Sequence, residues 1–264
     1  MILSADYHTH TVFSHGKGNI IDNALSAKEM GLKEIAISDH GFSHPAFGLT
    51  KSKTPKMRAL CDSATKETGI PVLLGIESNI IGTDGSVDLK ENMYDYFDVF
   101  LAGIHKFVLY KFGAIFSLAT PNLLYSFFKS KSVPKSLIKE NTKTFINVVK
   151  NNPVDAITHL NFCCFCDPLE VAKACADYGT YLELNAKKVH LYDEQIQEIL
   201  DKTNVRFIVS SDAHSPEKVG KVSLVEQMIS RINFPLDRID NIDGRLPNLR
   251  FKAFKDKLWV LLIA

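Results

Sequence analysis

The sequence has 264 residues, of which 45% are hydrophobic and 23% charged, a composition typical of a soluble globular protein with a sizeable core. Its formal net charge of +1 argues against nucleic acid or an anionic membrane as the main partner. Five cysteines are too few for a disulfide scaffold, and the first residues lack a secretory signal pattern, so we expect reduced thiols and a cytoplasmic location.

Short apolar or β-branched runs alternate with helical patterns along the whole chain. The expected strands are Ile2–His8, Glu34–Asp39, Val72–Glu77, Asp98–His105, Asp155–His159, Tyr181–Asn185 and Phe207–Ser211. The expected helices are Asp22–Met30, Pro55–Thr68, Lys135–Lys150, Leu169–Tyr178, Asp193–Lys202 and Glu217–Ile232. This alternation predicts an α/β fold with a parallel sheet and crossover helices. No Pro/Gly/Ser-rich linker divides the chain, so residues 1–264 are predicted to form a single domain.

One apolar segment, at about residues 107–131, interrupts this regular spacing. Its stretch Phe112–Phe128 carries no charge, but it is slightly short for a membrane span and contains Pro121, so no stable membrane insertion is expected. We interpret the segment as an extra helical hairpin packed on the barrel. The alternatives are an apolar lid, a contact in a homo-oligomer, or attachment to a membrane surface. The apolar residues 258–264 are expected to belong to a terminal helix that docks on the barrel.

Most histidines fall at the carboxyl end of an expected strand or in the loop that follows it. Those seven are His8, His10, His15, His40, His105, His159 and His214, and the acids Glu77 and Asp212 occupy equivalent places. In a parallel barrel these ends share one face, where active sites are built. Residues two apart on a strand point the same way, so His8 and His10 can both face the barrel mouth. Nine ligand-type residues exceed the needs of one catalytic zinc, which predicts more than one divalent ion: zinc, manganese or iron.

A single histidine at any one of these places is more often a hydrogen-bonded core residue, and only their coincidence favours metal binding. His44 and His190 lie further into loops and are predicted to be solvated. Cys163-Cys164-Phe165-Cys166 contains one C-x-x-C spacing without a second, so we expect a buried apolar turn and not a four-cysteine zinc site.

Five short motifs resemble those of the PHP (polymerase and histidinol phosphatase) family. They are Asp6-Tyr7-His8-Thr9-His10, Ser14-His15-Gly16, Ser38-Asp39-His40-Gly41, Gly75-Ile76-Glu77 and Ser210-Ser211-Asp212-Ala213-His214. The resemblance covers essentially the whole chain and is closest to small stand-alone phosphatase-like members. It implies a distorted, TIM-barrel-like (β/α)7 barrel with a trinuclear metal centre. The implied ligand sets are His8, His10, Glu77 and Asp212 for one ion, Glu77, His105 and His159 for a second, and His15, His40 and His214 for a third.

The same resemblance implies a metal-dependent phosphoesterase that hydrolyses a small phosphate monoester, with histidinol phosphate as one possibility. Metal-bound hydroxide is the expected nucleophile, because coordination lowers the pKa of water toward about 7. Catalysis is expected to depend on Asp212, which would orient that hydroxide, and on Glu77 and His159. The residues expected to reach the substrate phosphate, or else to form a polar rim of the barrel, are Asn185, Lys187 and Lys188.

Three other functions remain open from the sequence. An amidohydrolase-like enzyme would hydrolyse C–N or C–O bonds, and its barrel also begins with His-x-His. A nucleic-acid phosphodiesterase is disfavoured by the low net charge. A metal-binding module without enzymatic activity would result if residues 107–131 occluded the centre. A homo-oligomer is possible in each case.

Overall fold

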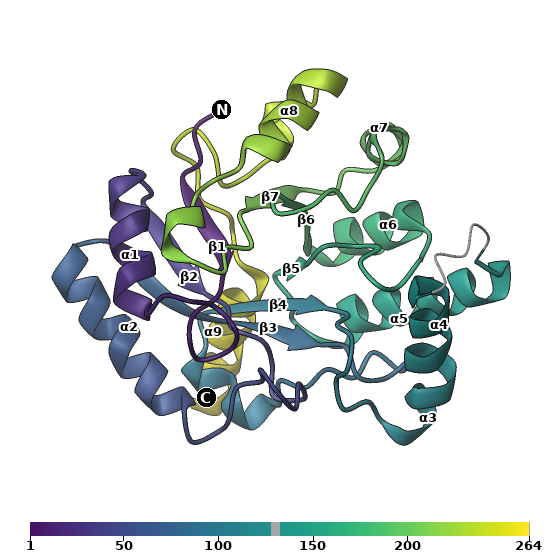
Figure 1. Cartoon of the computed structure of the whole chain (residues 1–264), viewed down its shortest axis with the longest axis horizontal. Coiled ribbons are helices and arrows are strands. Elements are labelled where there is room, and N and C mark those ends of the chain that lie inside the picture. The colour runs from purple at the N-terminus through teal and green to yellow at the C-terminus, as the bar shows by residue number, and fades with distance from the viewer. Residues whose placement is uncertain (128–132, 264) are drawn as a thin grey trace.

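The computed structural model of this chain describes residues 1–127 and 133–263, and within these ranges seven parallel strands form one sheet in the order β1 to β7. The strands are β1 (Ala5–Thr9), β2 (Glu34–Ile37), β3 (Val72–Asn79), β4 (Val99–Gly103), β5 (Ala156–Ile157), β6 (Tyr181–Asn185) and β7 (Phe207–Ser210). The sheet curls into a nearly closed barrel in which β1 and β7 lie beside each other, joined by an isolated parallel bridge between Thr9 and Ala213 (Figure 1). The predicted seven-stranded, TIM-like α/β fold is confirmed.

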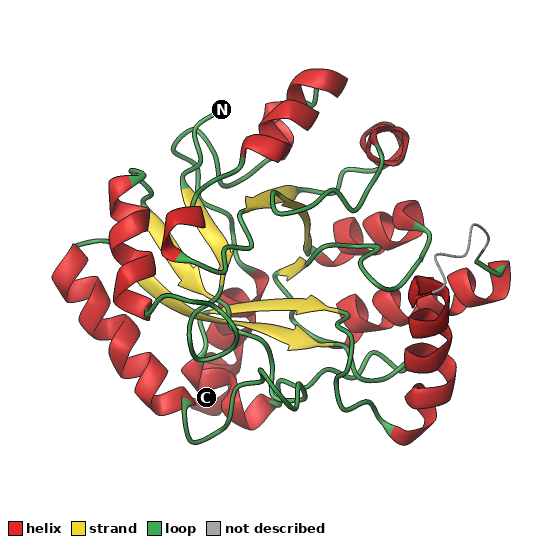
Figure 2. Cartoon of the chain, in the orientation of Figure 1, coloured by secondary structure: helices red, strands yellow, loops and turns green. Residues whose placement is uncertain are grey.

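Helices follow most strands and cover the outside of the barrel, as Figure 2 shows. They are α1 (Ile20–Glu29), α2 (Thr54–Thr68), α3 (Phe112–Ala114), α4 (Thr120–Phe127), α5 (Lys135–Asn151), α6 (Pro168–Tyr178), α7 (Asp193–Lys202), α8 (Ser223–Ile232) and α9 (Arg250–Ile263). Among the described residues, no helix is long and apolar enough to cross a membrane. The predicted terminal helix is present as α9, but the docking of residues 258–264 lies outside the described side chains.

Several predicted boundaries are wrong by two or more residues, and three of them have a clear structural reason. The first strand starts at Ala5 and not at Ile2, because Leu3 instead bridges Ile242 in the antiparallel sense. The fifth strand contains two residues, and it ends because His159 has a left-handed backbone with φ 30°. The last crossover helix starts at Ser223, since Gly220 has φ +71° and donates its N–H to the Asp6 carboxylate.

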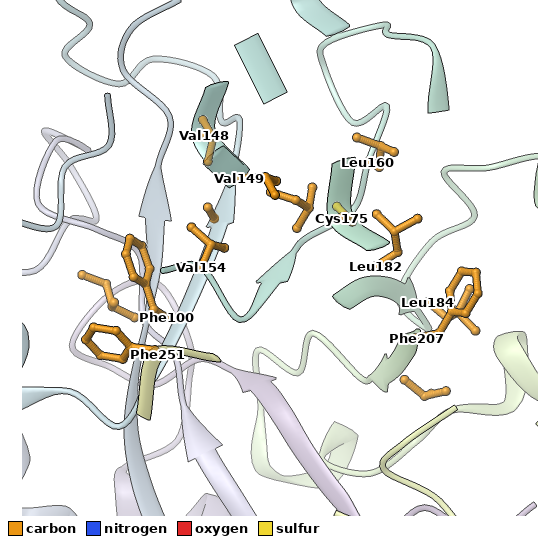
Figure 3. Packing of buried hydrophobic residues seen from close by; sticks show 14 of the residues in the cluster. Phe100, Val148, Val149, Val154, Leu160, Cys175, Leu182, Leu184, Phe207 and Phe251 are labelled. Carbon is orange, nitrogen blue, oxygen red and sulfur yellow. The ribbon is translucent and has the colours of Figure 1, made fainter. Parts of the chain in front are cut away.

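The alternation of side chains along each strand builds two apolar layers. Phe100 of β4 points into the layer beneath the helices, where its ring meets that of Phe251 from α9 edge-on at 5.4 Å (Figure 3). Its neighbours Val99 and Leu101 belong to a smaller cluster inside the barrel. The larger outer layer also contains Leu182, Leu184 and Phe207 from β6 and β7. Continuously apolar strands are therefore required, because both faces of this sheet are buried.

Asn241 closes the gap between β1 and β7. Its side chain is fully buried; Nδ2 donates to the carbonyls of Ala5 (2.8 Å) and Val209 (2.6 Å), and Oδ1 accepts the N–H of Val209 (2.9 Å). One amide side chain thereby supplies the hydrogen bonds that a continuous ladder would otherwise make between these two strands.

Asn241→Ala should lower the free energy of unfolding by about 2–4 kcal/mol, because it leaves buried backbone groups of both strands without partners. Urea unfolding followed by circular dichroism measures the change. Asn151→Ala, which removes an exposed bond to the Asp84 carbonyl, is the matched control. Equal midpoints for both variants would show that Asn241 does not hold the barrel closed.

In the described part of the apolar insertion, residues 107–111 are turn and loop and residues 112–127 form one helical stretch, not the hairpin that we predicted. The stretch runs from α3 through a π-helical turn at Ile115–Ala119 into α4. The wide turn directly precedes Pro121, which cannot donate a backbone hydrogen bond to the preceding turn. The strands β3 and β4 point toward the side of the molecule on which α3 and α4 lie (Figure 1). Residues 128–131 of the predicted insertion lie outside the described residues.

Candidate metal centre

A bulge in β1 turns His8, and His10 just beyond the end of the strand, into the barrel. The register with β2 shifts between Asp6 and Thr9, so that one extra residue is accommodated. Tyr7 packs in the inner cluster, and the next side chain, His8, also faces inward, with Nε2 3.3 Å from Glu77. The ring of His10 follows at a centroid distance of 5.0 Å from that of His8. The bulge therefore sets the direction of both imidazoles.

Glu77, near the end of β3, lies at the centre of the predicted ligand set. It is fully buried, and the Thr158 hydroxyl donates to its Oε1 at 3.1 Å. Five imidazole nitrogens lie within 3.6 Å of its oxygens: those of His159 (2.6 Å), His40 (2.9 Å), His105 (3.0 Å), His8 (3.3 Å) and His10 (3.6 Å). A carboxylate surrounded in this way is placed to bridge metal ions.

The predicted ligands form four overlapping groups whose donor atoms lie within 4.8 Å of one another. These are His8, His10 and Asp212; His8, Glu77 and His159; His40, Glu77 and His105; and His10, His40 and His214. His15 is in none of these groups, but its ring lies 4.1 Å from that of His214 and stacks on that of His40 at 4.7 Å. All nine predicted residues thus come together. Their division among three ions stays a prediction, because the groups share members.

The donor atoms of this cluster fit a bound cation. Five of them are buried without a hydrogen-bond partner: His8 Nε2, His10 Nδ1, His10 Nε2, His40 Nδ1 and Glu77 Oε2. Buried polar atoms of this kind are costly unless something satisfies them. Imidazole and carboxylate donors together suit zinc, manganese or iron, which would satisfy these atoms at once.

The charges of the cluster also suit metal binding. Burial alone would raise the pKa of the Glu77 carboxyl, but the imidazoles of His105 and His8 outweigh it and hold that pKa well below its usual range. The pKa of Asp212 is likewise well below its usual range, because His8 and His10 overcome the effect of burial. Burial keeps the pKa of His10 well below its ordinary value, whereas Glu77 and Glu183 outweigh burial and raise the pKa of His8 well above it. The ionised carboxylates and the neutral imidazole of His10 are in the forms that bind metal, and a metal ion would have to displace a proton from His8.

Glu183 of β6 is a functional residue that the sequence reasoning missed. Its Oε1 accepts a hydrogen bond from His8 Nδ1 at 2.6 Å, and its Oε2 accepts the backbone N–H of His159 at 2.7 Å. Donation from Nδ1 leaves the Nε2 lone pair of His8 free to face Glu77 and Asp212. An acidic residue inside a buried strand, two positions before Asn185, was the available signal.

Glu183→Gln should weaken metal affinity or turnover by roughly 10–100-fold, because the amide supports the tautomer of His8 less well. Competition with a chromophoric chelator measures the affinity. Glu170→Gln removes an exposed carboxylate that pairs with Lys173 and serves as the control. If Glu183→Gln binds metal and turns over like the wild type, the carboxylate does not position His8.

Other buried carboxylates hold the loops that carry the remaining histidines. Asp39 accepts hydrogen bonds from the backbone (2.7 Å) and hydroxyl (2.6 Å) of Thr11 and from the Ser14 hydroxyl, which fixes the loop between His10 and His15. His105 Nδ1 lies 2.8 Å from Asn79 Oδ1. The Asn79 amide in turn donates to the buried Asp88 at 2.6 Å.

A cavity of about 400 Å³ opens over the cluster and carries cationic side chains. Lys187 and Lys188 line it, as predicted for phosphate-binding groups, and Lys187 Nζ lies 3.2 Å from Asp212. Asn185 does not line this cavity: its amide donates to Glu183 and Asp212, and its oxygen accepts the N–H groups of both lysines. The structure therefore gives Asn185 the place of a positioning residue.

The prediction that His44 and His190 are simply solvated is wrong. Both are half-buried and line the same cavity, with the ring of His190 5.7 Å from that of His159. The C-x-x-C segment does form a turn in which Cys164 and Cys166 are buried.

Comparison with known proteins identifies relatives of this chain. A family model described as "PHP domain" matches residues 6–204, and one described as "PHP-associated" matches residues 192–227. A protein of Aliivibrio fischeri described as "Probable phosphatase" is 30% identical over 252 residues, covering 90% of this chain and 89% of the relative. A second protein described as "Probable phosphatase", from Caldanaerobacter subterraneus, is 29% identical over 254 residues, which cover 90% of this chain and 87% of the relative.

A solved structure shares the fold. The histidinol phosphate phosphatase from Lactococcus lactis, in complex with zinc, L-histidinol and phosphate, superposes with a TM-score of 0.60 at 15% identity. The match covers 89% of this chain and 95% of that protein.

Proposed function

The chain belongs to the PHP domain family, and from this premise we propose that it is a metal-dependent phosphatase that hydrolyses a small phosphate monoester. The observation that carries the proposal is the cluster of nine ligand-type residues, seven of them buried, beneath a cavity lined by Lys187 and Lys188. The phosphatase descriptions of the relatives and the zinc, L-histidinol and phosphate in the similar structure agree with it.

Two or three divalent ions would be held by the residues of the cluster. His8, His10 and Asp212 would hold one, His105 and His159 another, and Glu77 would lie between them. A third place is offered by His40 and His214 with His15 beside them. Such ions supply an activated water and neutralise the charge of the phosphoryl group.

The protein's own residues would bind and orient the substrate. Lys187 and Lys188 would attract the dianionic phosphate, because both line the cavity that opens over the cluster. Asp212 lies between this rim and the cluster, 3.4 Å from His10 and 3.2 Å from Lys187, so that it is placed to orient a water molecule. Glu183 would hold the His8 imidazole in position, and the Asn185 amide would hold the Asp212 carboxylate.

The proposal is tested by phosphate release from a panel of phosphate monoesters that includes histidinol phosphate. Protein stripped with a chelator is reloaded with zinc, manganese or iron, and His159→Ala treated identically is the control. Metal-dependent release that the variant lacks is the expected result. Hydrolysis of amides or lactones without release of phosphate from any ester would contradict the proposal.

We also propose that the chain acts in the cytoplasm as a single domain. All five cysteines are unpaired, and one sheet contains strands from both ends of the chain.

A further inference from the structure

A second cavity of about 300 Å³ lies beside the metal centre, and we call it the annex. Its walls come from the segment that follows β4, from the π-helical turn and from α4. The annex and the cavity over the cluster share three lining residues: His105, Lys106 and Phe107. The annex therefore adjoins the place where a substrate phosphate would bind, and the predicted metal ligand His105 lies on the boundary between the two cavities.

The lining of the annex is mainly apolar, although His105, Lys106, Thr120 and Cys163 also contribute to it. Its apolar lining residues are Ile104, Val108, Leu109, Ile115, Ala119 and Leu123. Two polar side chains in the wall are already engaged: the Tyr110 hydroxyl donates to the His105 carbonyl at 2.8 Å, and the Asn122 amide donates to the Leu118 carbonyl and to Asn141. An apolar group is the occupant that such a wall favours.

Polar anchors hold the walls in place. Asn122 of α4 and Asn141 of α5 exchange amide hydrogen bonds at 2.9 and 2.8 Å, and both are buried. At the other end, the backbone N–H of Leu109 donates to the Ser43 carbonyl and that of Lys111 to the Ile81 carbonyl. The annex is thus a preformed feature of the fold, and binding there needs little reordering.

Phe107 marks the junction between the two cavities. It has a left-handed backbone (φ 60°), which is unfavourable for a bulky side chain, and its side chain is 70% exposed although it lines both cavities. Backbone strain of this kind is found where the surroundings require a particular direction of the chain. Here it keeps an aromatic ring at the boundary between the charged and the apolar compartment.

We propose that the annex receives the apolar alcohol part of the substrate, so that the preferred substrates are phosphate monoesters of apolar alcohols. This inference rests on the proposed phosphatase function and names its substrate class. A volume of 300 Å³ is about twice that of a cavity that binds benzene, about 150 Å³, which suits a fused bicyclic ring or a medium-length alkyl chain. The phosphate would lie over the cluster beside Lys187 and Lys188.

The reaction consumes one water molecule. Its oxygen forms a bond to phosphorus, the bond from phosphorus to the alcohol oxygen breaks, and that oxygen takes up a proton from the water. The products are inorganic phosphate and the free alcohol, which remains in the annex until it dissociates.

Pairs of substrates with matched leaving groups test the proposal: octyl against ethyl phosphate for alkyl chains, and 1-naphthyl against phenyl phosphate for aromatic rings. With metal-loaded protein, we expect kcat/KM to be at least about tenfold higher for the larger member of one pair. Ala119→Trp fills the annex and should bring that ratio close to one by lowering kcat/KM for the larger ester. Ser117→Trp, on an exposed position of the same turn that lines neither cavity, should keep the wild-type ratio.

Leu123→Gln, which introduces an amide into the annex, tests the same point without added bulk, and the exposed Leu124→Gln is its control. A wild-type ratio near one, or a ratio that Ala119→Trp and Leu123→Gln leave unchanged, would overturn the proposal. If no ester releases phosphate, the proposed function fails, and the annex is then judged by calorimetric binding of 1-naphthol and octanol. Binding that Ala119→Trp abolishes would support the annex as an apolar site, and absence of binding would refute it.

Discussion

Glu77→Gln should reduce metal-dependent phosphate release by roughly 10³-fold or more. The side chain keeps its shape, but the substitution removes the one charge that five imidazoles surround within 3.6 Å. An amide nitrogen also cannot serve as a metal ligand in place of a carboxylate oxygen. Steady-state kinetics and metal content, measured on the same sample, report the two effects together.

The exposed Glu198, which pairs with Lys202, provides the matched control, since Glu198→Gln removes a carboxylate without touching the barrel. We expect wild-type turnover and metal content for this variant. Near-normal turnover of Glu77→Gln with a full complement of metal would show that Glu77 is not a bridging ligand, and the assignment of the centre would have to be revised.

Removing the metal should lower the melting temperature by about 8–16 °C. An ion present at 1,000 times its Kd stabilises the native state by about 4 kcal/mol, and 1 kcal/mol corresponds to about 2–4 °C for a chain of this size. Without ions, the unpartnered donor atoms of His8, His10 and His40 remain buried. Differential scanning calorimetry of stripped and reloaded protein measures the shift.

The same scan on Glu77→Gln separates this effect from nonspecific binding of metal to the surface. Addition of metal should raise the melting temperature of this variant far less than that of the wild type. If stripping the wild-type protein left its melting temperature unchanged, the cluster would not be a tight metal site, whatever the activity.

The fold was predictable because both faces of every strand are buried. In runs such as Val99–Leu101, successive side chains face opposite sides of the sheet and all of them are apolar. This pattern distinguishes a parallel sheet that is covered on both faces from a sheet with one face in solvent. The boundaries were less predictable. The shortness of β5 depends on the backbone of His159, and the late start of α8 depends on a bond between Gly220 and the distant Asp6. Neither has a local sequence signal.

The ligand-type residues of the site could be found because strand ends converge in a parallel barrel, but their supports could not. The bulge in β1 arises from the register in which β1 pairs with β2, and the sequence of β1 alone does not specify that register. Glu183 contacts His8, 175 positions away, and the backbone N–H of His159, and its role follows only from these contacts. The positions of His44 and His190 depend on loop conformation, which lacks a periodic pattern that could be used for prediction.

The closure of the barrel by Asn241 has a consequence for synthesis of the chain. This residue bonds to Ala5, 236 positions earlier, so at 5–20 residues per second roughly 10–50 s separate the translation of the two. Until β7 (Phe207–Ser210) and Asp212 have been translated, which takes up most of that interval, β1 has no neighbour on its β7 side and His8 and His10 lack Asp212. A nascent chain thus carries a His-x-His pair long before its partners exist, so that correct loading with metal has to follow the synthesis of β7 and Asp212 or compete with premature capture of ions.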